Sequence, residues 1–529
     1  MAADYRPNLS VRIQPALSTG PPGSPMRTEQ QVRPTLREHL AFAIQTPCDF
    51  ILKAACGTYP TFLGVFKLLP PGYLAWASGV KARKAYYRAL REVPAYGEFV
   101  RARSGASIPE TDKESYIRPF STDTRCVGGT FLDARTMIDE SSGSTGTPYN
   151  WVRSERERHE SHTFVSYFAT YCFGRERWIT INAFSMGAWA TGLNMGLSLQ
   201  KNGVVKNTGP DIAKILHTLR FFGPQHTYLI CGYPPFLKHL IDVGQAEGFP
   251  FEQYKLFGLA GGEGMSEGLR DYLLRRFEKV YSGYGATDLE IGIAGETPVA
   301  VAIRRLARDR EDVRHALFGR DSRLPMLFQY NPIMHHADVN EHGEVVFTIT
   351  RASVLSPRIR YNVHDVGGVC TSDEMAARLA AVGIDIAQLR RDSGDGNVQL
   401  PFLWVYGRRD YTISVMGANI YPEDLEQCLY QDTELAEVTH SFCLSVAEGP
   451  DGAVRPRFLF EVSGEPNAEL ERRFAESIVP RLIALNADFR EAWHEYPETL
   501  VPEIVLYRVG EGPFAADATK IKQVRFLAA

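Results

Sequence analysis

Residues 139–151, DESSGSTGTPYNW, gather hydroxyl side chains and two glycines into one short stretch that could bind phosphate. Glycines let backbone N–H groups converge on an anion, and serine and threonine hydroxyls add donors. A flexible linker has a similar composition. Because Pro148 restricts the chain where it must turn, and a charged, helix-compatible run follows at 153–171, we favour a phosphate-binding loop over a linker.

This loop is not a Walker motif, because Thr147 follows Gly146 where G-x-x-x-x-G-K-[ST] requires lysine. The cation that balances the phosphate charge must therefore come from elsewhere. Four further glycine-rich or polar breaks follow the loop. Each is weak evidence alone, since glycine and aspartate are common in turns, so their order and spacing carry the argument. They lie at 259–266, 281–290, 358–368 and 406–419.

The composition is that of a globular protein with room for two or more domains. The 529 residues are 44% hydrophobic and 23% charged, with a formal net charge of -4. This charge gives no general attraction to nucleic acid, and no nucleic-acid motif is present. The eight cysteines include no C-x-x-C pair and no zinc-like spacing, which predicts reduced thiols in a cytoplasmic protein.

The beginning of the chain predicts no signal peptide and no transmembrane segment. Residues 1–32 lack a continuous apolar core and are interpreted as a disordered lead-in. Residues 41–80 are apolar, but lysines and prolines interrupt them before a membrane-spanning length is reached. We expect buried helices broken by turns here; contact with a membrane surface is the alternative.

The sequence predicts an α/β fold with a large N-terminal domain at 33–406. Residues 33–116 have a helical pattern, and strand-like runs then alternate with helix-like runs, which indicates layered, mainly parallel sheets. The runs at 343–350 and 356–362 predict strands of a more β-rich subdomain. The strand-like runs of the alternating part are 177–184, 226–233 and 254–262, and the helix-like runs are 210–223 and 266–278.

A second, small α+β domain is expected at 407–529. A polar break near 390–397 precedes a new pattern of strands, and the boundary is placed near Gly407. Pro422, Glu423 and Asp424 are residue types suited to the start of a helix.

Taken together, the loop and the four breaks resemble the adenylate-forming ligase superfamily, and specifically its branch of phenylacetate-CoA ligases. The resemblance runs from about Val93 to the C-terminus. The loop SSGSTGTP is similar to the superfamily's phosphate loop, YGATD at 284–288 resembles its Tyr-Gly-x-Thr-Glu motif, and GRRDYTISVMGANIYPEDLE at 407–426 resembles its hinge motif. IPETDKESYI at 108–117 resembles the P-x-T-x-K segment of the branch. The resemblance implies that the small domain is mobile.

The resemblance implies a role for each matching residue. Asp365 would accept the ribose hydroxyls, Arg408 would approach the nucleotide, and Asp410 would be the hinge. Thr287 would contact the α-phosphate and Asp288 would hold Mg²⁺. The remaining nucleotide-binding positions would be Ser141, Ser142, Gly143, Ser144, Thr145, Gly146 and Thr147 around the β- and γ-phosphates, and Gly261, Gly262, Glu263, Tyr284 and Gly285 around the adenine.

The missing cation is implied at the C-terminus. GPFAADATKIKQVRF at 512–526 resembles the terminal lysine motif of the family and places Lys520 at the catalytic lysine, with Lys522 as the alternative. Thr519 stands where the motif has glycine. Asp288 is one methylene shorter than the usual glutamate, so Glu290 or a water would complete the Mg²⁺ shell.

The acyl pocket is expected between the phosphate loop and the strand at 281–285, lined by 182–192 and 231–236. Its aromatic residues favour an apolar or aromatic carboxylic acid; the alternative is that they are ordinary core residues. They are Phe184, Trp189, Tyr233 and Phe236.

Several charged or titratable residues lie outside these motifs. His162 and His364 could face the site, and the pair His335–His336 is interpreted as a loop feature rather than a metal site. The arginines between Arg304 and Arg323 predict a solvated helix face, with binding of CoA phosphates as the alternative.

The sequence therefore predicts an ATP- and Mg²⁺-dependent ligase that converts a carboxylic acid to an acyl-adenylate and transfers it to a thiol. CoA is the acceptor that the branch implies, and a carrier-protein thiol or an amine is the alternative. A non-catalytic, nucleotide-binding homologue is the competing class. The branch also suggests a homodimer.

Overall fold

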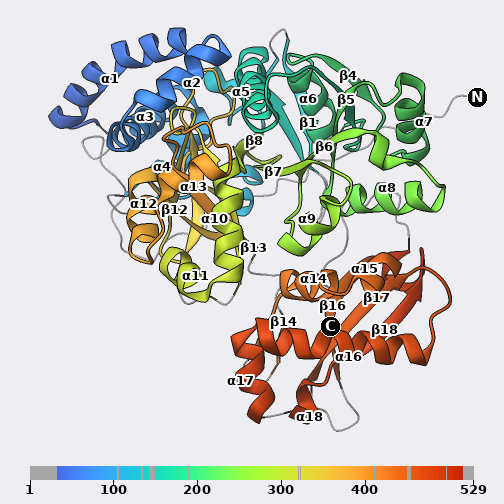
Figure 1. The fold of residues 1–529 in the computed structure, drawn as a ribbon. Coiled ribbons are helices and arrows are strands. Elements are labelled where there is room, and N and C mark those ends of the chain that lie inside the picture. The colour runs from blue at the N-terminus through green and yellow to red at the C-terminus, as the bar shows by residue number, and fades with distance from the viewer. Residues whose placement is uncertain are drawn as a thin grey trace, which may run out of the picture.

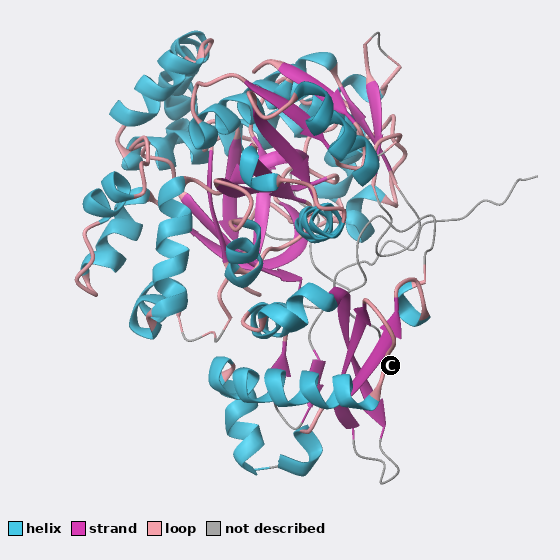
Figure 2. Ribbon diagram, turned by 45° about the vertical axis from the view of Figure 1, so that its right-hand side comes forward, coloured by secondary structure: helices cyan, strands magenta, loops and turns pink. Residues whose placement is uncertain are grey.

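The computed structural model describes most of the chain as a large domain with a smaller C-terminal unit beneath it (Figures 1 and 2). The described residues are 33–103, 107–132, 135–141, 149–188, 190–319, 321, 323–408, 413–415, 418–448, 454–495 and 497–515.

The N-terminal region is helical, as its pattern predicts. Thr35 caps the first helix, since its hydroxyl accepts from the backbone of Glu38 and the Glu38 carboxylate accepts from the backbone of Thr35. The helices are α1 (Leu36–Ala55), α2 (Tyr59–Leu68), α3 (Pro71–Glu92) and α4 (Pro94–Arg101), followed by a π-helical turn at Lys113–Ile117 and a 3₁₀ turn at Val127–Gly129.

One sheet of eleven strands forms the centre of the large domain, in the order β10-β11-β12-β13-β9-β8-β7-β6-β5-β3-β4. The strands from β4 to β7 are parallel and alternate with helices, as predicted. They are β3 (Trp178–Asn182), β4 (Val204–Asn207), β5 (Thr227–Gly232), β6 (Lys255–Gly261) and β7 (Lys279–Ala286), with helices α5 (Glu155–Phe173), α6 (Ala190–Leu199), α7 (Ile212–Phe222), α8 (Pro234–Ala246) and α9 (Glu267–Leu273).

The expected β-rich subdomain is the antiparallel half of the same sheet. Its strands are β8 (Glu290–Gly295), β9 (Met326–Tyr330), β10 (His335–Val339), β11 (Glu344–Ile349), β12 (Tyr361–Cys370) and β13 (Phe402–Arg408). The helices α10 (Pro298–Asp309), α11 (Glu311–Phe318), α12 (Ser372–Ala380) and α13 (Ile386–Asp392) accompany it.

Three details of the predicted pattern are wrong. The strand expected at 356–362 begins only at Tyr361, because Arg360 has a φ of 44°, which is incompatible with a strand. His335 and His336 belong to strand β10 rather than to a loop. Arg304 is buried in an ion-pair network rather than solvated.

The C-terminal unit has its own hydrophobic core and a three-stranded sheet. Pro422 is the first residue of α14, as its helix-start signal predicts. The elements are β14 (Ile413–Val415), β15 (Ala418–Ile420), α14 (Pro422–Tyr430), α15 (Thr433–Val438), β16 (Thr439–Glu448), β17 (Val454–Val462), α16 (Ala468–Leu485), α17 (Ala487–Glu495), α18 (Pro497–Leu500), β18 (Glu503–Arg508) and a 3₁₀ turn at Gly512–Phe514.

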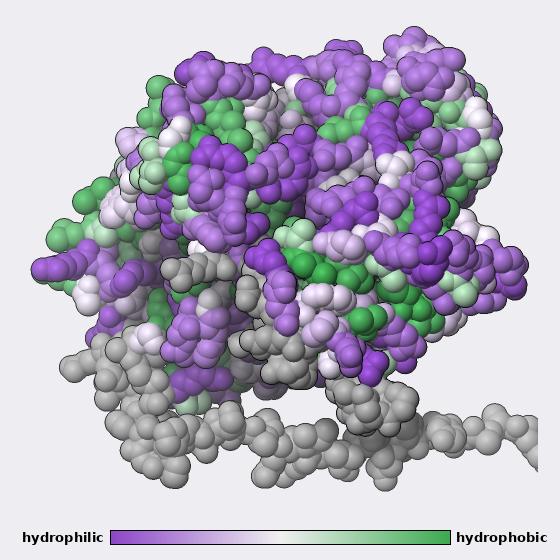
Figure 3. Space-filling model, turned by 60° about the horizontal axis from the view of Figure 1, so that its bottom comes forward, coloured by the Kyte–Doolittle hydropathy of each residue, from purple (hydrophilic) through white to green (hydrophobic). Residues whose placement is uncertain are grey.

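The face shown in Figure 3 is mostly hydrophilic, with hydrophobic side chains in scattered patches. In the described part of the chain, no helix combines the length and the apolar character that crossing a bilayer requires. All eight cysteines are free thiols, as predicted.

Candidate functional site

A short hairpin holds the base of the Ser/Gly loop. Strands β1 (Met137–Glu140) and β2 (Asn150–Arg153) pair in antiparallel fashion, and the backbone N–H of Ser141 donates to the carbonyl of Tyr149 at 2.9 Å. The Ser141 hydroxyl in turn accepts from the backbone N–H of Tyr149 at 2.9 Å. The side chain of Arg153 donates to the carbonyl oxygen of Thr287 at 2.7 Å. The hairpin that carries the loop therefore lies beside the turn between β7 and β8.

The turn between β7 and β8 carries Thr287 and Asp288. The Tyr361 hydroxyl donates to the Asp288 carboxylate at 3.0 Å, and the ammonium of Lys113 lies 3.7 Å from the same oxygen. Burial, reinforced by the charge of Asp288, raises the pKa of Tyr361 above its ordinary value, so this hydroxyl stays protonated as a donor. The Asp288 side chain is 17% exposed, which leaves it accessible from the solvent side.

Backbone pairing positions Lys113. Thr111 forms a parallel bridge with Tyr361, its N–H donates to the carbonyl of Arg360 at 3.1 Å, and its carbonyl accepts from Asn362 at 2.8 Å. Because this short stretch is hydrogen-bonded beside the start of β12, the lysine two residues later reaches the Asp288 carboxylate. The sequence singled out the segment at 108–117 but did not assign this lysine a role.

A second cation missed in the sequence, Arg358, lies fully buried behind Asp288. Its side chain donates to the Asp288 carbonyl at 2.7 Å, and its guanidinium carbon lies 4.7 Å from the centroid of the Trp151 ring. Burial lowers the pKa of Arg358 to about 10, which still leaves it protonated at neutral pH. The region around the turn is therefore rich in positive charge.

Tyr284, Asp365 and Arg408 come together although they are far apart in the sequence. The Tyr284 hydroxyl donates to the Asp365 carboxylate at 2.6 Å. Asp365 on β12 is the direct neighbour of Arg408 on β13 in the strand register. The Tyr284 ring packs against Phe328 and Phe347, with centroids 5.6 and 6.0 Å away. A carboxylate held in this way can accept two vicinal hydroxyl groups.

The turn after β6 needs glycine at Gly262. Its φ is +85°, and a Cβ there would lie 2.5 Å from the Tyr233 ring. Both the backbone conformation and the close approach of the ring exclude a larger residue without a shift. Burial raises the pKa of Tyr233 to about 12, with a smaller contribution from the charge of Glu263 in the same turn.

A cavity of about 100 Å³ lies between this turn and the turn that carries Thr287. Phe184 and Tyr233 line it, with ring centroids 5.2 Å apart. The described lining does not include Phe236, which packs, partly buried, against the main hydrophobic core. The other lining residues are mostly apolar or glycine: Glu140, Phe164, Val165, Phe168, Ala190, Thr191, Met195, Leu259, Ala260, Gly261, Gly262, Gly283, Gly285, Ala286, Thr287, Ile291, Gly292 and Ala294.

Three residues that were considered for the site have other partners. His162 is buried and hydrogen-bonds Asn194 at 2.9 Å, and burial lowers its pKa to about 4. His364 is half exposed, and its ring lies 3.5 Å from Glu344. Glu290 is buried against His335, at 2.9 Å, and the Arg351 guanidinium. Glu290 is therefore engaged by other side chains and does not suit the role of a second Mg²⁺ ligand.

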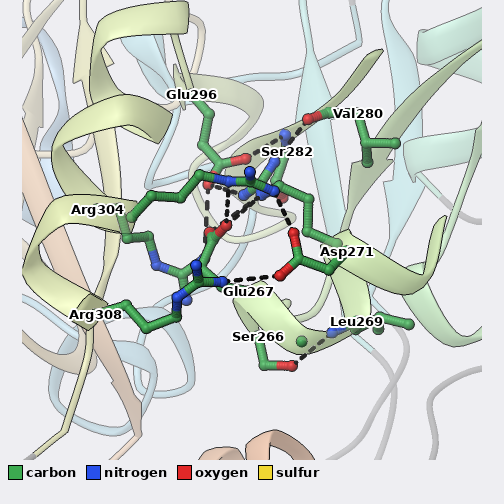
Figure 4. Close-up of polar contacts among 12 residues, drawn as sticks. Ser266, Glu267, Leu269, Asp271, Val280, Ser282, Glu296, Arg304 and Arg308 are labelled. Atoms are coloured by element: carbon green, nitrogen blue, oxygen red, sulfur yellow. Dashed lines mark hydrogen bonds and ion pairs between the residues drawn. The ribbon is translucent and has the colours of Figure 1, made fainter. Parts of the chain in front are cut away.

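A buried network of charges fixes the strand that leads to Tyr284 (Figure 4). Arg270 of α9 donates to Glu267 at 3.0 Å and to Glu296 at 2.5 Å. Arg304 of α10 donates to Glu267 at 2.6 Å, and Glu296 accepts from the backbone N–H of Ser282 on β7 at 2.8 Å. Burial opposes the charge on Glu267, but the neighbouring arginines lower its pKa below the ordinary value.

The same helix α9 is the main platform for the C-terminal unit. The Glu426 carboxylate of α14 accepts from the backbone N–H of Ser266 at 2.9 Å, and the Gln427 side chain accepts from Gly268 at 3.2 Å. Lys238 of α8 donates to the Thr439 carbonyl at 2.9 Å. The buried network therefore connects the domain contact with strand β7 of the site.

Other predicted site residues lie outside the described residues. They are Ser142, Gly143, Ser144, Thr145, Gly146, Thr147, Trp189, Asp410, Thr519, Lys520 and Lys522, together with the side chain of Arg408. Of the residues that are described, no group of three or more His, Cys, Asp or Glu side chains has the arrangement of a metal site.

Comparison with known proteins gives a likeness in structure. No family sequence model and no curated protein sequence matches the chain. The structure of 2-hydroxyisobutyryl-CoA ligase in the postadenylation state, in complex with 2-HIB-AMP, matches with a TM-score of 0.62. It shares 13% sequence identity, over 88% of this chain and 92% of that chain. The fold is that of an adenylate-forming ligase. The same ligase in complex with R3-HIB-AMP matches with a TM-score of 0.60 and 12% identity, over the same shares of the two chains.

Proposed function

We propose that this protein activates a carboxylic acid with ATP and transfers the acyl group to the thiol of CoA. One observation carries the proposal: on an adenylate-forming fold, residues from distant motifs lie around one end of the sheet. The Asp288 carboxylate accepts a hydrogen bond from Tyr361 and lies 3.7 Å from the Lys113 ammonium, and the Tyr284 hydroxyl donates to the Asp365 carboxylate. A scattered set of turn residues would not be expected to converge in this way.

The first step would join the acid to the nucleotide. A carboxylate oxygen attacks the α-phosphorus of ATP, and the bond to pyrophosphate breaks. The charge that builds up on the phosphate oxygens would be stabilised by the Lys113 ammonium and by donors of the loop that begins at Ser141. Lys520, proposed from its motif, would bring a further positive charge. Tyr284 and Asp365 would hold the ribose.

Mg²⁺ bound with ATP would use the second oxygen of the Asp288 carboxylate, since Tyr361 and Lys113 both approach the first. This ion typically binds one or two carboxylates together with substrate phosphates and water, so a single accessible carboxylate fits its requirements. When bound, the ion would neutralise phosphate charge. The residues that would hold it are Asp288 and, through its hydrogen bond to that carboxylate, Tyr361.

The acid is proposed to be compact and apolar. The cavity of about 100 Å³ is lined by Phe184, Tyr233 and Met195. An engineered apolar cavity of about 150 Å³ binds benzene, so a single ring is near the upper limit of size here. A long acyl chain would require the cavity to open.

In the second step the thiolate of CoA would attack the acyl carbonyl, and AMP would leave. A carrier-protein thiol or an amine would use the same adenylate and would differ only in contacts at the surface. A nucleotide-binding homologue without activity would bind ATP and release no pyrophosphate.

The test is pyrophosphate release from the full-length protein with ATP, Mg²⁺ and acids of increasing size: acetate, isobutyrate, benzoate and octanoate. We expect release with the compact apolar acids and little with octanoate, and faster AMP release when CoA is added. AMP release at the same rate with and without CoA would favour another acceptor. Tight ATP binding without release for any acid would contradict the ligase proposal.

A further inference from the structure

Helix α1 turns an apolar face toward the solvent. At 3.6 residues per turn, eight of its residues fall within a sector of about 120°. None of the eight has a polar side chain, and all are exposed; the exposed fraction is 77% for both Leu36 and Phe50. We call them the α1 stripe: Leu36, Leu40, Ala43, Ile44, Pro47, Phe50, Ile51 and Ala54.

The opposite face of α1 is fixed against α3 by polar contacts, beside the buried Leu52 and the Phe42 ring that packs on Tyr87. Asp49 forms an ion pair with the buried Lys81. Arg83 donates to Glu38 at 2.7 Å, and Lys84 donates to Thr46 at 2.8 Å. The polar contacts therefore set the rotation of the helix and point the stripe outward. A surface helix of a globular protein normally has the reverse arrangement, with its apolar face on the core.

An exposed apolar surface of this length usually marks a site of interaction. The helix has 20 residues and is about 30 Å long. The stripe offers no side-chain hydrogen-bond group, whereas protein interfaces form about one hydrogen bond per 100–200 Å². A purely apolar, linear surface fits the acyl region of a bilayer better than it fits a protein partner.

The charges around the stripe favour an anionic surface. From Arg33, where the described chain begins, to the end of this helix, the exposed charged residues are basic: Arg33, Arg37 and Lys53. The acidic residues Glu38 and Asp49 face α3, where Arg83 and Lys81 hold them; Lys53 lies 3.7 Å from Asp49. A helix with an apolar face and basic flanks is typical of those that lie in the interface of membranes containing anionic lipids.

We propose that α1 is a membrane-surface helix that places the α1 stripe at the boundary of headgroups and acyl chains in an anionic bilayer. Figure 1 shows α1 at the outer edge of the large domain, away from the C-terminal unit. A bilayer could therefore approach the stripe without meeting that unit. This proposal does not depend on the proposed ligase activity.

The experiment is flotation of the full-length protein with two kinds of vesicle, one of phosphatidylcholine alone and one with added phosphatidylglycerol. We expect the protein to float with the anionic vesicles and to be released by salt. The double variant Leu40→Glu/Ile44→Glu should bind at least about tenfold more weakly, because charges replace two apolar anchors.

Two further variants separate the contribution of the apolar stripe to vesicle binding from that of its basic flanks. Val204→Glu/Phe221→Glu is the matched control, since these residues are 62% and 72% exposed on other elements; it should bind as the parent does. Arg37→Glu/Lys53→Glu should lose preference for anionic vesicles. A thermal melt shows that each variant is folded.

Three results would overturn the proposal. The first is absence of vesicle binding by the parent at low salt. The second is equal binding by the parent and Leu40→Glu/Ile44→Glu. The third is a parent protein that is a dimer by light scattering and does not bind vesicles, while Leu40→Glu/Ile44→Glu is a monomer. The stripe would then contact a second copy of the chain.

Discussion

Removal of one hydroxyl group, in Tyr284→Phe, should weaken ATP use without unfolding the protein. The hydroxyl donates to the Asp365 carboxylate at 2.6 Å, a hydrogen bond to a charged group that typically contributes about 1.5–3 kcal/mol. The phenylalanine ring retains the packing on Phe328 and Phe347. Because this bond orients the carboxylate that is proposed to accept the ribose hydroxyls, its energy enters ATP binding at most in full. At about 1.4 kcal/mol per factor of ten, its loss should raise the KM for ATP about tenfold, with about 100-fold as the upper bound.

The assay is acid-dependent pyrophosphate release at varied ATP, with the KM for the acid measured in parallel. The acid KM should change little, because the hydroxyl lies at the proposed ribose end of the site. Tyr281→Phe is the matched control: it lies on the same strand, but its ring packs on Phe173 at 5.5 Å. An ATP KM within twofold of the parent for Tyr284→Phe, or an equal effect of Tyr281→Phe, would refute the reasoning.

Three other substitutions test the turn, the buried network and the C-terminal unit. Gly262→Ala should reduce kcat/KM for the acid at least about tenfold, because the new Cβ would lie 2.5 Å from the Tyr233 ring at a φ of +85°. Gly264 has open space around it, so the control Gly264→Ala should leave kcat/KM unchanged. Arg270→Met should lower the Tm by several degrees in a thermal melt, because it removes a buried cation from both Glu267 and Glu296 and leaves Glu296 with Arg304 at 3.9 Å, a loss of about 3–5 kcal/mol; an unchanged Tm would contradict this. Burial raises the pKa of Asp424 to about 7, above its unfolded value, so the stabilisation from its bound proton is complete below about pH 4 and is lost as the pH rises toward 7. Asp424→Asn should therefore raise the free energy of unfolding at pH 8 by an amount on the order of 2–4 kcal/mol, seen as a higher Tm, and by less at pH 5; equal effects at the two pH values would show that the proton is not responsible.

The alternation of strands and helices predicted the parallel half of the sheet, because each buried strand has a continuous apolar run. The antiparallel half was harder to predict. Because Arg360 has a positive φ, strand β12 begins one residue after it, at Tyr361, and the composition of the segment does not indicate this. Arg304 looks like part of a solvated arginine run, but the fold brings Glu267 and the carbonyl of Pro325 to it, and its side chain is buried there.

The contacts around the candidate site follow from the sequence only in part. Motif order identified Tyr284, Asp288 and Asp365 as candidates, and the structure brings two of them into contact. The position of Lys113 beside Asp288 was not predicted, because it depends on the pairing of Thr111 with Tyr361, which is 250 residues away in the sequence. Contacts between distant segments of this kind have no local signal in a single sequence.

Formation of an acyl-adenylate is the central claim, and its direct detection is the most decisive measurement. Protein, Mg²⁺, ATP labelled at the α-phosphate and a compact apolar acid are mixed in a single turnover without CoA, for the parent and for Lys520→Ala. We predict a labelled acyl-AMP species in the parent, which CoA then converts to AMP and thioester, and a loss of that species in the variant. Absence of labelled acyl-AMP with every acid, or equal formation by Lys520→Ala, would contradict the account.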